Sequence, residues 1–396
     1  MRKPHPFDFS HRFVNYAAMD NDSPVRVAVV GVGRAGWGMQ CSEIDRRPSM
    51  FTVVAGCDTY APWRERFADR YPSARITDAI DDVLGDPAVE LVSIATRSVD
   101  HYAHAMRALR AGKIVFVEKP MCSTYEQARS LCAESDRGPG TLYVRHNRRF
   151  EPGFRAVRSI LESGLIGDPV QIRLSRTSYG RRNDWQTLLE FGGGQLSNWG
   201  SHIIDHALQF LGAPAMPLRS VHASLARVAA VGDAEDHVKI VLTGQTGTVV
   251  DVEVSGGAAI ASPEYLIWGT KGGLTGGGGT LHLRYLDPDS TLAPRTAYPG
   301  VPGSEFTQPS GALALGNRTI GSNFGQPEDL PWIEEDRRVP DGDPSEIWDH
   351  LHAAIRRDAP FPVTLDEAVE VIRVIDAARS GTQFAQESSA DAYTLA

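Results

Sequence analysis

Residues 25–36 read Val25-Arg-Val-Ala-Val-Val-Gly31-Val-Gly33-Arg-Ala-Gly36. The first six residues form an almost continuous apolar run, which predicts a parallel strand covered on both faces. The glycines follow at the spacing GxGxxG, and the segment after them, to about residue 47, predicts a helix. The stretch therefore predicts a strand, a tight glycine turn and a helix in immediate succession.

This glycine turn is typical of a dinucleotide-binding loop. The first glycine permits the turn, the second lets the backbone approach a pyrophosphate, and the third lets the helix pack on the strand. Asp58 ends the next apolar run, 22 residues after Gly36. Its carboxylate would bind both ribose hydroxyls of NAD and repel the 2′-phosphate of NADP, although Arg64 nearby keeps NADP possible. The alternative is a glycine-rich turn with a surface aspartate. Predicted nucleotide contacts in this region are Gly31, Gly33, Arg34, Ala35, Gly36 and Asp58.

Strands and helices alternate over the first 147 residues. Further apolar runs predict strands at 51–57, 91–95 and 114–117, and helices are predicted at about 62–71 and 100–111. This alternation is typical of a doubly wound parallel sheet, so residues 25–147 are predicted to form a Rossmann domain. Residues 1–24 lack periodicity and are interpreted as a disordered N-terminal arm.

A second domain is predicted over residues 148–396. Helices at 153–162 and 197–211 are followed by alternating runs at 170–174, 237–242 and 248–254, which favour a mostly antiparallel sheet. Residues 285–340 are rich in Pro and Gly and predict long surface loops. Helices at about 345–357 and 365–380 close the chain and are candidates to pack back on the first domain.

Composition excludes several classes of protein. The 396 residues carry 40 Lys+Arg and 49 Asp+Glu, a net charge of −9, which argues against a nucleic-acid partner. The sequence contains no apolar run of about 18 residues and no secretory signal, so we expect no membrane partner and a cytoplasmic location. The four cysteines are too scattered for a disulfide framework or a metal knuckle.

Three polar residues share one face of the predicted helix at 197–211. At about 100° per residue, Asn198, His202 and Asp205 fall within a narrow arc of an otherwise apolar helix. A catalytic group, a satisfied buried network and a metal pair formed by His202 and His206 remain open as interpretations. We expect no metal, because further ligands are not evident.

Three motifs resemble one family of enzymes. They are Glu118-Lys119-Pro120 after a strand that begins Ala111-Gly-Lys, Asn147-Arg-Arg-Phe-Glu-Pro152, and Gly192-Gly-Gly-Gln-Leu-Ser-Asn-Trp-Gly-Ser-His202-Ile-Ile-Asp205. Together they resemble the glucose–fructose oxidoreductase, inositol dehydrogenase and MocA (Gfo/Idh/MocA) family from residue 25 to about 381. The resemblance implies a Rossmann domain plus an α/β domain with a large antiparallel sheet, and a homodimer or homotetramer.

The resemblance also implies site residues. Lys119 corresponds to the family lysine that contacts nicotinamide ribose and substrate, and His202 to the residue that takes the hydroxyl proton. Asn198 stands where the family usually has an aspartate that positions the histidine, and an amide can orient an imidazole without neutralising its charge. Further expected cofactor contacts are Thr96, Arg97, His101 and Glu118.

The expected activity is oxidation of a secondary hydroxyl by NAD, or by NADP, on a sugar, sugar alcohol, inositol or glycoside. Histidine accepts a proton near neutrality, and a lysine ammonium stabilises a developing alkoxide. A redox-assisted glycosidase or lyase and a non-catalytic sugar sensor are the alternatives. Residues expected to contact the substrate are Asn147, Tyr179, Arg182, Trp185 and Asp205.

Overall fold

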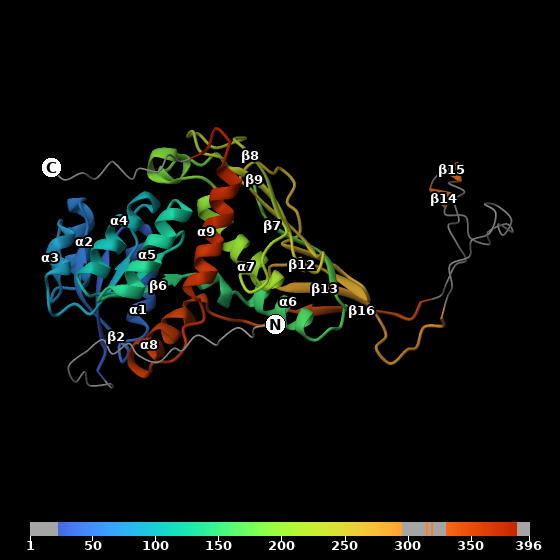
Figure 1. The fold of residues 1–396 in the computed structure, drawn as a ribbon, viewed down its shortest axis with the longest axis horizontal. Coiled ribbons are helices and arrows are strands. Elements are labelled where there is room, and N and C mark those ends of the chain that lie inside the picture. The colour runs from blue at the N-terminus through green and yellow to red at the C-terminus, as the bar shows by residue number, and fades with distance from the viewer. Residues whose placement is uncertain (1–22, 295–313, 316–317, 320–329, 386–396) are drawn as a thin grey trace, which may run out of the picture.

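Two sheets organise the computed structural model, which describes residues 23–294, 314–315, 318–319 and 330–385. The first sheet has six strands in the order β3-β2-β1-β4-β5-β6, and every pairing within it is parallel. The second has eight strands in the order β16-β13-β12-β11-β7-β10-β9-β8. In Figure 1 the two sheets lie at opposite sides of the helices α7 and α9. The predicted fold class is confirmed.

The parallel sheet is the core of the first domain. Its strands are β1 (Val25–Val30), β2 (Phe51–Cys57), β3 (Arg75–Thr77), β4 (Leu91–Ile94), β5 (Ile114–Glu118) and β6 (Thr141–Arg145). The sequence did not predict β3 and β6. The order reverses between β1 and β4, which is the point where open parallel sheets bind ligands beyond the carboxyl ends of their strands. The strand order therefore places the glycine loop and the end of β4 together.

Helices cover both faces of the parallel sheet. A π-helical turn (Gly36–Cys41) runs into α1 (Ser42–Asp45), and the other helices are α2 (Ala61–Arg70), α3 (Ile80–Leu84), α4 (His101–Arg110) and α5 (Tyr125–Arg137). Thr124 caps α5 by accepting a hydrogen bond from the backbone N–H of Gln127. The predicted helix after the glycines is therefore present, with a wider first turn.

The eight-stranded sheet contains a single parallel pair among its described pairings, between β7 and β10. Its strands are β7 (Pro169–Thr177), β8 (Ser220–Ala226), β9 (His237–Thr243), β10 (Val249–Ser255), β11 (Tyr265–Gly269), β12 (Gly272–Gly277), β13 (Thr280–Leu286) and β16 (Trp332–Arg338). Along β13, Leu281, Leu283 and Tyr285 are buried while the alternate residues face solvent. The expected self-association through this domain stays a prediction.

The prediction of loops throughout 285–340 is wrong for its two ends. β13 continues to Leu286, and Trp332–Arg338 pairs antiparallel with it as the edge strand β16. The last five residues of β16 are all charged, so the strand lacks the alternation of apolar and polar residues from which strands are predicted. Ala314–Leu315 and Arg318–Thr319 form the short strands β14 and β15. The rest of the predicted loop region, and residues 1–22 of the predicted arm, lie outside the described residues.

Helices of the second domain pack between the two sheets. They are α6 (Pro152–Glu162), α7 (Ser201–Leu211) and α9 (Leu365–Arg379), with α7 preceded by a π-helical turn at Leu196–Gly200. Helix α9 begins at a capping box formed by Thr364 and Glu367 and packs against α5, α7 and β8. It therefore contacts elements of both domains (Figure 1).

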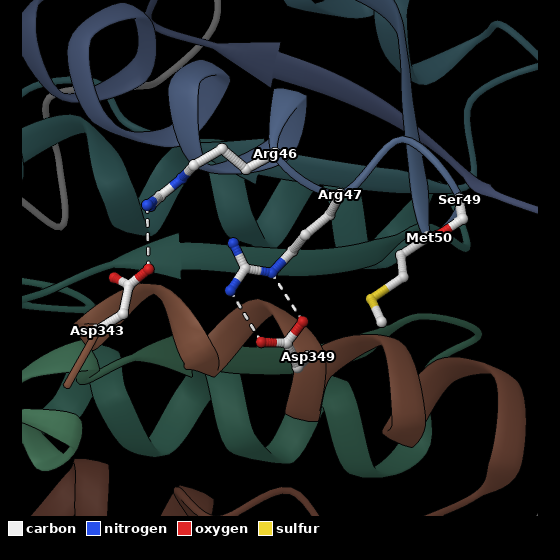
Figure 2. A pocket seen from close by; sticks show the side chains of 6 residues that line it. All are labelled: Arg46, Arg47, Ser49, Met50, Asp343 and Asp349. Carbon is white, nitrogen blue, oxygen red and sulfur yellow. Dashed lines mark hydrogen bonds and ion pairs between the residues drawn. The ribbon is translucent and has the colours of Figure 1, made fainter.

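Helix α8 (Ile347–Arg357) docks on the first domain through apolar and ionic contacts. Trp348 is fully buried, with its ring centroid 5.2 Å from that of Phe51 and 5.0 Å from that of Phe116. Figure 2 shows the ionic part, in which Arg46 pairs with Asp343 at 3.0 Å and Arg47 donates to both carboxylate oxygens of Asp349. The hollow at this junction is lined by these paired charges, Ser49 and Met50, so we assign it no ligand.

Two further findings concern the described residues as a whole. Among them, no helix combines the length and the apolar character needed to cross a bilayer. All four cysteines are free thiols, and Cys41, Cys57 and Cys122 are buried.

Replacement of Trp348 tests the docking of α8. We expect Trp348→Ala to lower the free energy of unfolding of the first domain by about 3–5 kcal/mol, because a large buried ring leaves a cavity. Urea unfolding followed by circular dichroism measures the change. Trp332→Ala is the matched control, since Trp332 is 39% exposed on the edge strand. Equal losses in the two variants would contradict the inferred role of Trp348.

Candidate active site

The glycine loop has the geometry of a dinucleotide cradle. Gly31 has a φ of +87°, and a Cβ there would lie 2.7 Å from the backbone carbon of Ala95. A Cβ on Gly36 would lie 2.0 Å from the carbonyl oxygen of Gly31, so only glycine fits at both places. A Cβ on Gly33 would meet nothing within 4 Å. The space beside the Gly33 backbone is therefore open where a pyrophosphate must approach it, which fits the expected cofactor.

Asp58 lies directly after β2, beside this loop. Its Oδ2 accepts a hydrogen bond from the backbone N–H of Val32 at 2.9 Å, and its Oδ1 accepts one from Tyr60 at 2.9 Å. Two backbone donors hold the carboxylate in a single orientation. Arg64 donates to the carbonyl oxygens of Asp58 and Thr59 instead of pairing with the Asp58 carboxylate.

His101 joins the ends of two parallel strands. Its Nδ1 lies 2.7 Å from the carbonyl oxygen of Pro120, and its Nε2 lies 3.3 Å from that of Thr96. Burial lowers the pKa of His101, so the ring is neutral with one N–H, and the shorter contact is the donated bond. The expectation that His101 contacts the cofactor is not supported, because backbone carbonyls face both of its nitrogens. The Thr96 hydroxyl lies 3.2 Å from Nδ1 of His104.

Glu118 is buried in an ionic network beneath the site. It accepts hydrogen bonds from Arg145 at 2.8 Å and from Gln40 at 3.1 Å, and Arg145 also pairs with Glu43 at 2.5 Å. Burial acts to raise the pKa of Glu118, but Arg145, Lys119 and Gln40 together hold that pKa below its usual value. Both of these bonds go to Oε1 of Glu118 and anchor the end of β5. The expected cofactor contact of Glu118 stays a prediction.

Lys119 follows Glu118 and reaches the second domain. Its Nζ donates to the backbone carbonyl of Asn198 at 3.0 Å. Burial lowers the pKa of Lys119 to about 8; Glu118 acts to raise the pKa, while Arg148, Arg145 and Arg34 lower it further. The amine is thus present in both its charged and its neutral form around neutral pH.

His202 lies in the first turn of α7, near Lys119. Its side chain is buried, and its Nδ1 has no hydrogen-bond partner within the described part of the chain. Burial, with the charges of Lys119 and Arg148, lowers the pKa of His202 well below its usual value. The imidazole is therefore neutral at pH 7.

The expected hydrogen bond between Asn198 and His202 is not found among the described residues. Residues 196–200 form a π-helical turn, which is wider than an α-helical turn, so the rotation of 100° per residue fails between positions 198 and 202. The contribution of Asn198 is its backbone carbonyl, which accepts from Lys119 and from the Ser201 hydroxyl.

Asp205 and His206 form their contacts with residues other than Lys119 and His202. Both Asp205 oxygens accept hydrogen bonds from Arg149, at 2.6 and 2.8 Å, so the expected contact of Asp205 with substrate is not supported. The His206 ring stacks on Phe154 with centroids 4.0 Å apart, and its Nε2 lies 2.9 Å from the Arg148 carbonyl. The described residues contain no group of three or more His, Cys, Asp or Glu that could hold a metal ion.

Sequence reasoning missed two side chains near His202, those of His146 and Trp199. The ring centroid of His146 lies 6.5 Å from that of His202, and the ring of Trp199 lies 5.9 Å away. The guanidinium of Arg148 sits over Trp199 at 4.7 Å. His146 directly follows the parallel strand β6. Prediction of that strand from the sequence, together with the rule that ligands bind at the carboxyl ends of parallel strands, would have found it.

The remaining predicted residues lie around this centre. Arg34 of the glycine loop donates to Gln186 at 3.2 Å, and Arg97 sits over the ring of Phe191 at 4.0 Å. These contacts link the nucleotide loop and the end of β4 to the segment 185–191 of the second domain. Within the other expected substrate contacts, Asn147 is buried, Trp185 is partly buried, Arg182 pairs with Asp184, and Tyr179 is 62% exposed.

Comparison with known proteins agrees with this geometry. Residues 25–146 match the NAD-binding Rossmann fold of the GFO/IDH/MocA oxidoreductase family, and residues 154–275 match the C-terminal domain of that family. The chain belongs to this family of NAD(P)-binding oxidoreductases.

Relatives span most of the chain. It is 28% identical to scyllo-inositol 2-dehydrogenase (NADP(+)) IolW of Bacillus subtilis over 79% of this chain and 82% of the relative. It is 30% identical to an uncharacterized oxidoreductase of Schizosaccharomyces pombe over 63% of this chain and 69% of the relative. An NAD-binding protein from Listeria innocua shares the fold, with a TM-score of 0.70 at 22% identity, over 90% of this chain and 96% of its own.

A pair of glycine variants tests the cradle without any substrate. We expect Gly33→Ala to keep the melting temperature of the protein and to weaken NADH binding, because the added methyl group occupies space that the protein leaves open. Gly31→Ala should instead lower the melting temperature, since its backbone conformation and the nearby Ala95 backbone disfavour a side chain. NADH fluorescence titration and thermal unfolding are the measurements. Unchanged NADH affinity in Gly33→Ala would place the nucleotide elsewhere.

Proposed function

We propose that this protein oxidises a secondary hydroxyl group of a cyclitol or sugar with NAD as the hydride acceptor. The hydrogen bond from Lys119 Nζ to the Asn198 carbonyl carries the proposal. It joins the end of a strand in the nucleotide-binding sheet to the turn that precedes His202. An amine and an imidazole from two domains therefore lie together beside the predicted nicotinamide site.

Cofactor binding is assigned to the glycine loop and to Asp58. The backbone at Gly33 would approach the pyrophosphate, Arg34 would add a positive charge, and Thr96 and Arg97 lie at the neighbouring strand end. The Asp58 carboxylate supports a preference for NAD over NADP, because it would repel a 2′-phosphate. When bound, the nicotinamide accepts a hydride from the carbon that bears the hydroxyl.

The proton of the hydroxyl goes to Lys119 in this proposal. His202 is flanked by Lys119 and Arg148, and its expected carboxylate partner is replaced by Asn198. Burial and the charge of Arg148 make formation of an imidazolium costly, so His202 acts as a neutral hydrogen-bond partner of the substrate oxygen. The neutral amine of Lys119, whose pKa is lowered to about 8, accepts the proton. This modifies the expectation that His202 is the base.

The residues expected to contact the substrate support its chemical class. Asn147, Arg182 and Trp185 offer donors, acceptors and a ring face, a mixture that suits a polyhydroxylated ring. The name of the B. subtilis relative, scyllo-inositol 2-dehydrogenase, supports a cyclitol.

A substrate panel tests the proposed function. The purified protein is mixed with NAD or NADP and with scyllo-inositol, myo-inositol, glucose and methyl glucoside, and absorbance at the wavelength of reduced nicotinamide is followed. We expect reduction of NAD with a cyclitol, and a loss of about 10²–10⁴-fold in kcat for Lys119→Ala, as is typical for removal of an acid–base group.

Other outcomes identify the alternatives. Cleavage of the glycoside without net reduction of NAD would replace the proposal with a redox-assisted glycosidase or lyase. Binding of nucleotide and sugar without any chemistry would indicate a sensor.

The pH dependence of oxidation tests the assignment of the base. Because Lys119 must be neutral to accept a proton, kcat/KM should rise about tenfold per pH unit below pH 8 and level off above it. A base at His202, whose pKa lies well below 6.5, would give a profile that is already flat between pH 6.5 and 9. Lys119→Arg keeps the positive charge and should remain inactive across the range. A flat wild-type profile would return the role of base to His202.

A further inference from the structure

His146 occupies the boundary between the two domains. It follows β6 and precedes a 3₁₀ turn at Asn147–Phe150, and its side chain is 2% exposed. Its backbone N–H donates to Val144 at 3.1 Å, and its carbonyl accepts from Arg149 at 3.2 Å. The backbone on both sides therefore holds the ring in place.

Two imidazoles with free nitrogens lie side by side here. The His146 and His202 rings stand edge to face, with an interplanar angle of 84° and centroids 6.5 Å apart. The Nδ1 atom of each is buried and lacks a hydrogen-bond partner among the described residues. Each unpartnered buried nitrogen costs roughly 1–3 kcal/mol, so two adjacent ones indicate a polar ligand between or beside the rings.

Burial, together with the surrounding charges, keeps both rings neutral. Burial lowers the pKa of His146 to about 4; Asp205 acts to raise that pKa, while Arg149, Lys119 and His206 lower it. The Asp205 carboxylate is already bound by Arg149, so it does not bond to either ring. A neutral imidazole has one donor and one acceptor nitrogen, which suits it to a hydroxyl group.

We propose that His146 binds the hydroxyl adjacent to the one that is oxidised, so that His146 and His202 together select a vicinal diol. His202 holds the reacting hydroxyl near Lys119, and His146 holds its neighbour on the same ring of the substrate. This inference rests on the proposed function and narrows its substrate class to vicinal diols. His146 keeps its proton throughout the reaction.

The discriminating probes are trans-1,2-cyclohexanediol and cyclohexanol, which differ by one hydroxyl. Each is measured as kcat/KM or, where turnover is too slow, as an inhibition constant against the best substrate of the panel. We expect the wild-type protein to favour the diol by about 10- to 100-fold, as is typical of one hydrogen bond to a buried polar group. In His146→Leu the preference for the diol should fall to the small factor that arises because the diol offers two hydroxyl groups and cyclohexanol offers one.

Two further variants separate recognition from folding. His146→Asn keeps a donor and an acceptor and should retain part of the preference. His352→Asn removes a buried histidine of α8 that packs on Phe51, far along the chain from the site, and should keep the full preference. NADH affinity and melting temperature are recorded for each variant. An unchanged NADH affinity in His146→Leu shows that the nucleotide site is intact.

The outcomes distinguish this inference from the proposed function. A wild-type protein that oxidises a cyclitol but treats both probes alike overturns the inference and leaves the proposed function standing. The same holds if His146→Leu retains the diol preference. A protein that binds NADH but neither oxidises nor binds any hydroxylated ring overturns both.

Discussion

The bond between Lys119 and the carbonyl of Asn198 is the contact on which the site depends. Lys119 ends a buried strand of the first domain, and Asn198 lies in the turn that introduces α7 of the second. The amine of Lys119 can be buried because the carboxylate of Glu118, the preceding residue, carries a compensating negative charge. Glu118 is in turn held by Arg145 and Gln40. The pKa of Lys119 thus depends on a buried ionic network in the first domain.

Burial shifts the pKa values of the basic groups at the candidate site in the same direction. Loss of water lowers the pKa of Lys119, His146 and His202 alike, because each of these groups is positively charged when protonated. Asp205, a carboxylate near the His146 ring, is held by Arg149. This direction supports the proposed transfer of the proton to the amine and the proposed role of the imidazoles as neutral hydrogen-bond partners of hydroxyl groups. Asn198 stands where the family resemblance leads us to expect an aspartate, and it supplies no negative charge beside His202.

The sequence predicted those parts of the protein that depend on local pattern. An apolar run followed by GxGxxG predicts its strand, turn and helix because the glycine geometry is local, and Gly31 and Gly36 meet their backbone neighbours as expected. Strand β16 was missed because most of its residues are consecutive charged residues, and because it lies beside a Pro- and Gly-rich region. The angular prediction for Asn198 failed because a π-helical turn, which no residue pattern announced, changes the rotation between positions 198 and 202.

Residue type and order by themselves indicated the two-sheet architecture and the family, and they nominated Lys119 and His202 as candidate site residues. Only the tertiary structure decided what each polar group contacts. In the sequence, Asp205 and Glu118 are as plausible as Lys119 for binding a ligand. In the structure, however, both carboxylates form ion pairs with arginines that are distant in the chain. His146, which carries no motif, comes to lie beside His202. The physical reason is that pKa and hydrogen-bonding capacity depend on burial and on the nearest charges, which are set by contacts between segments far apart in the chain.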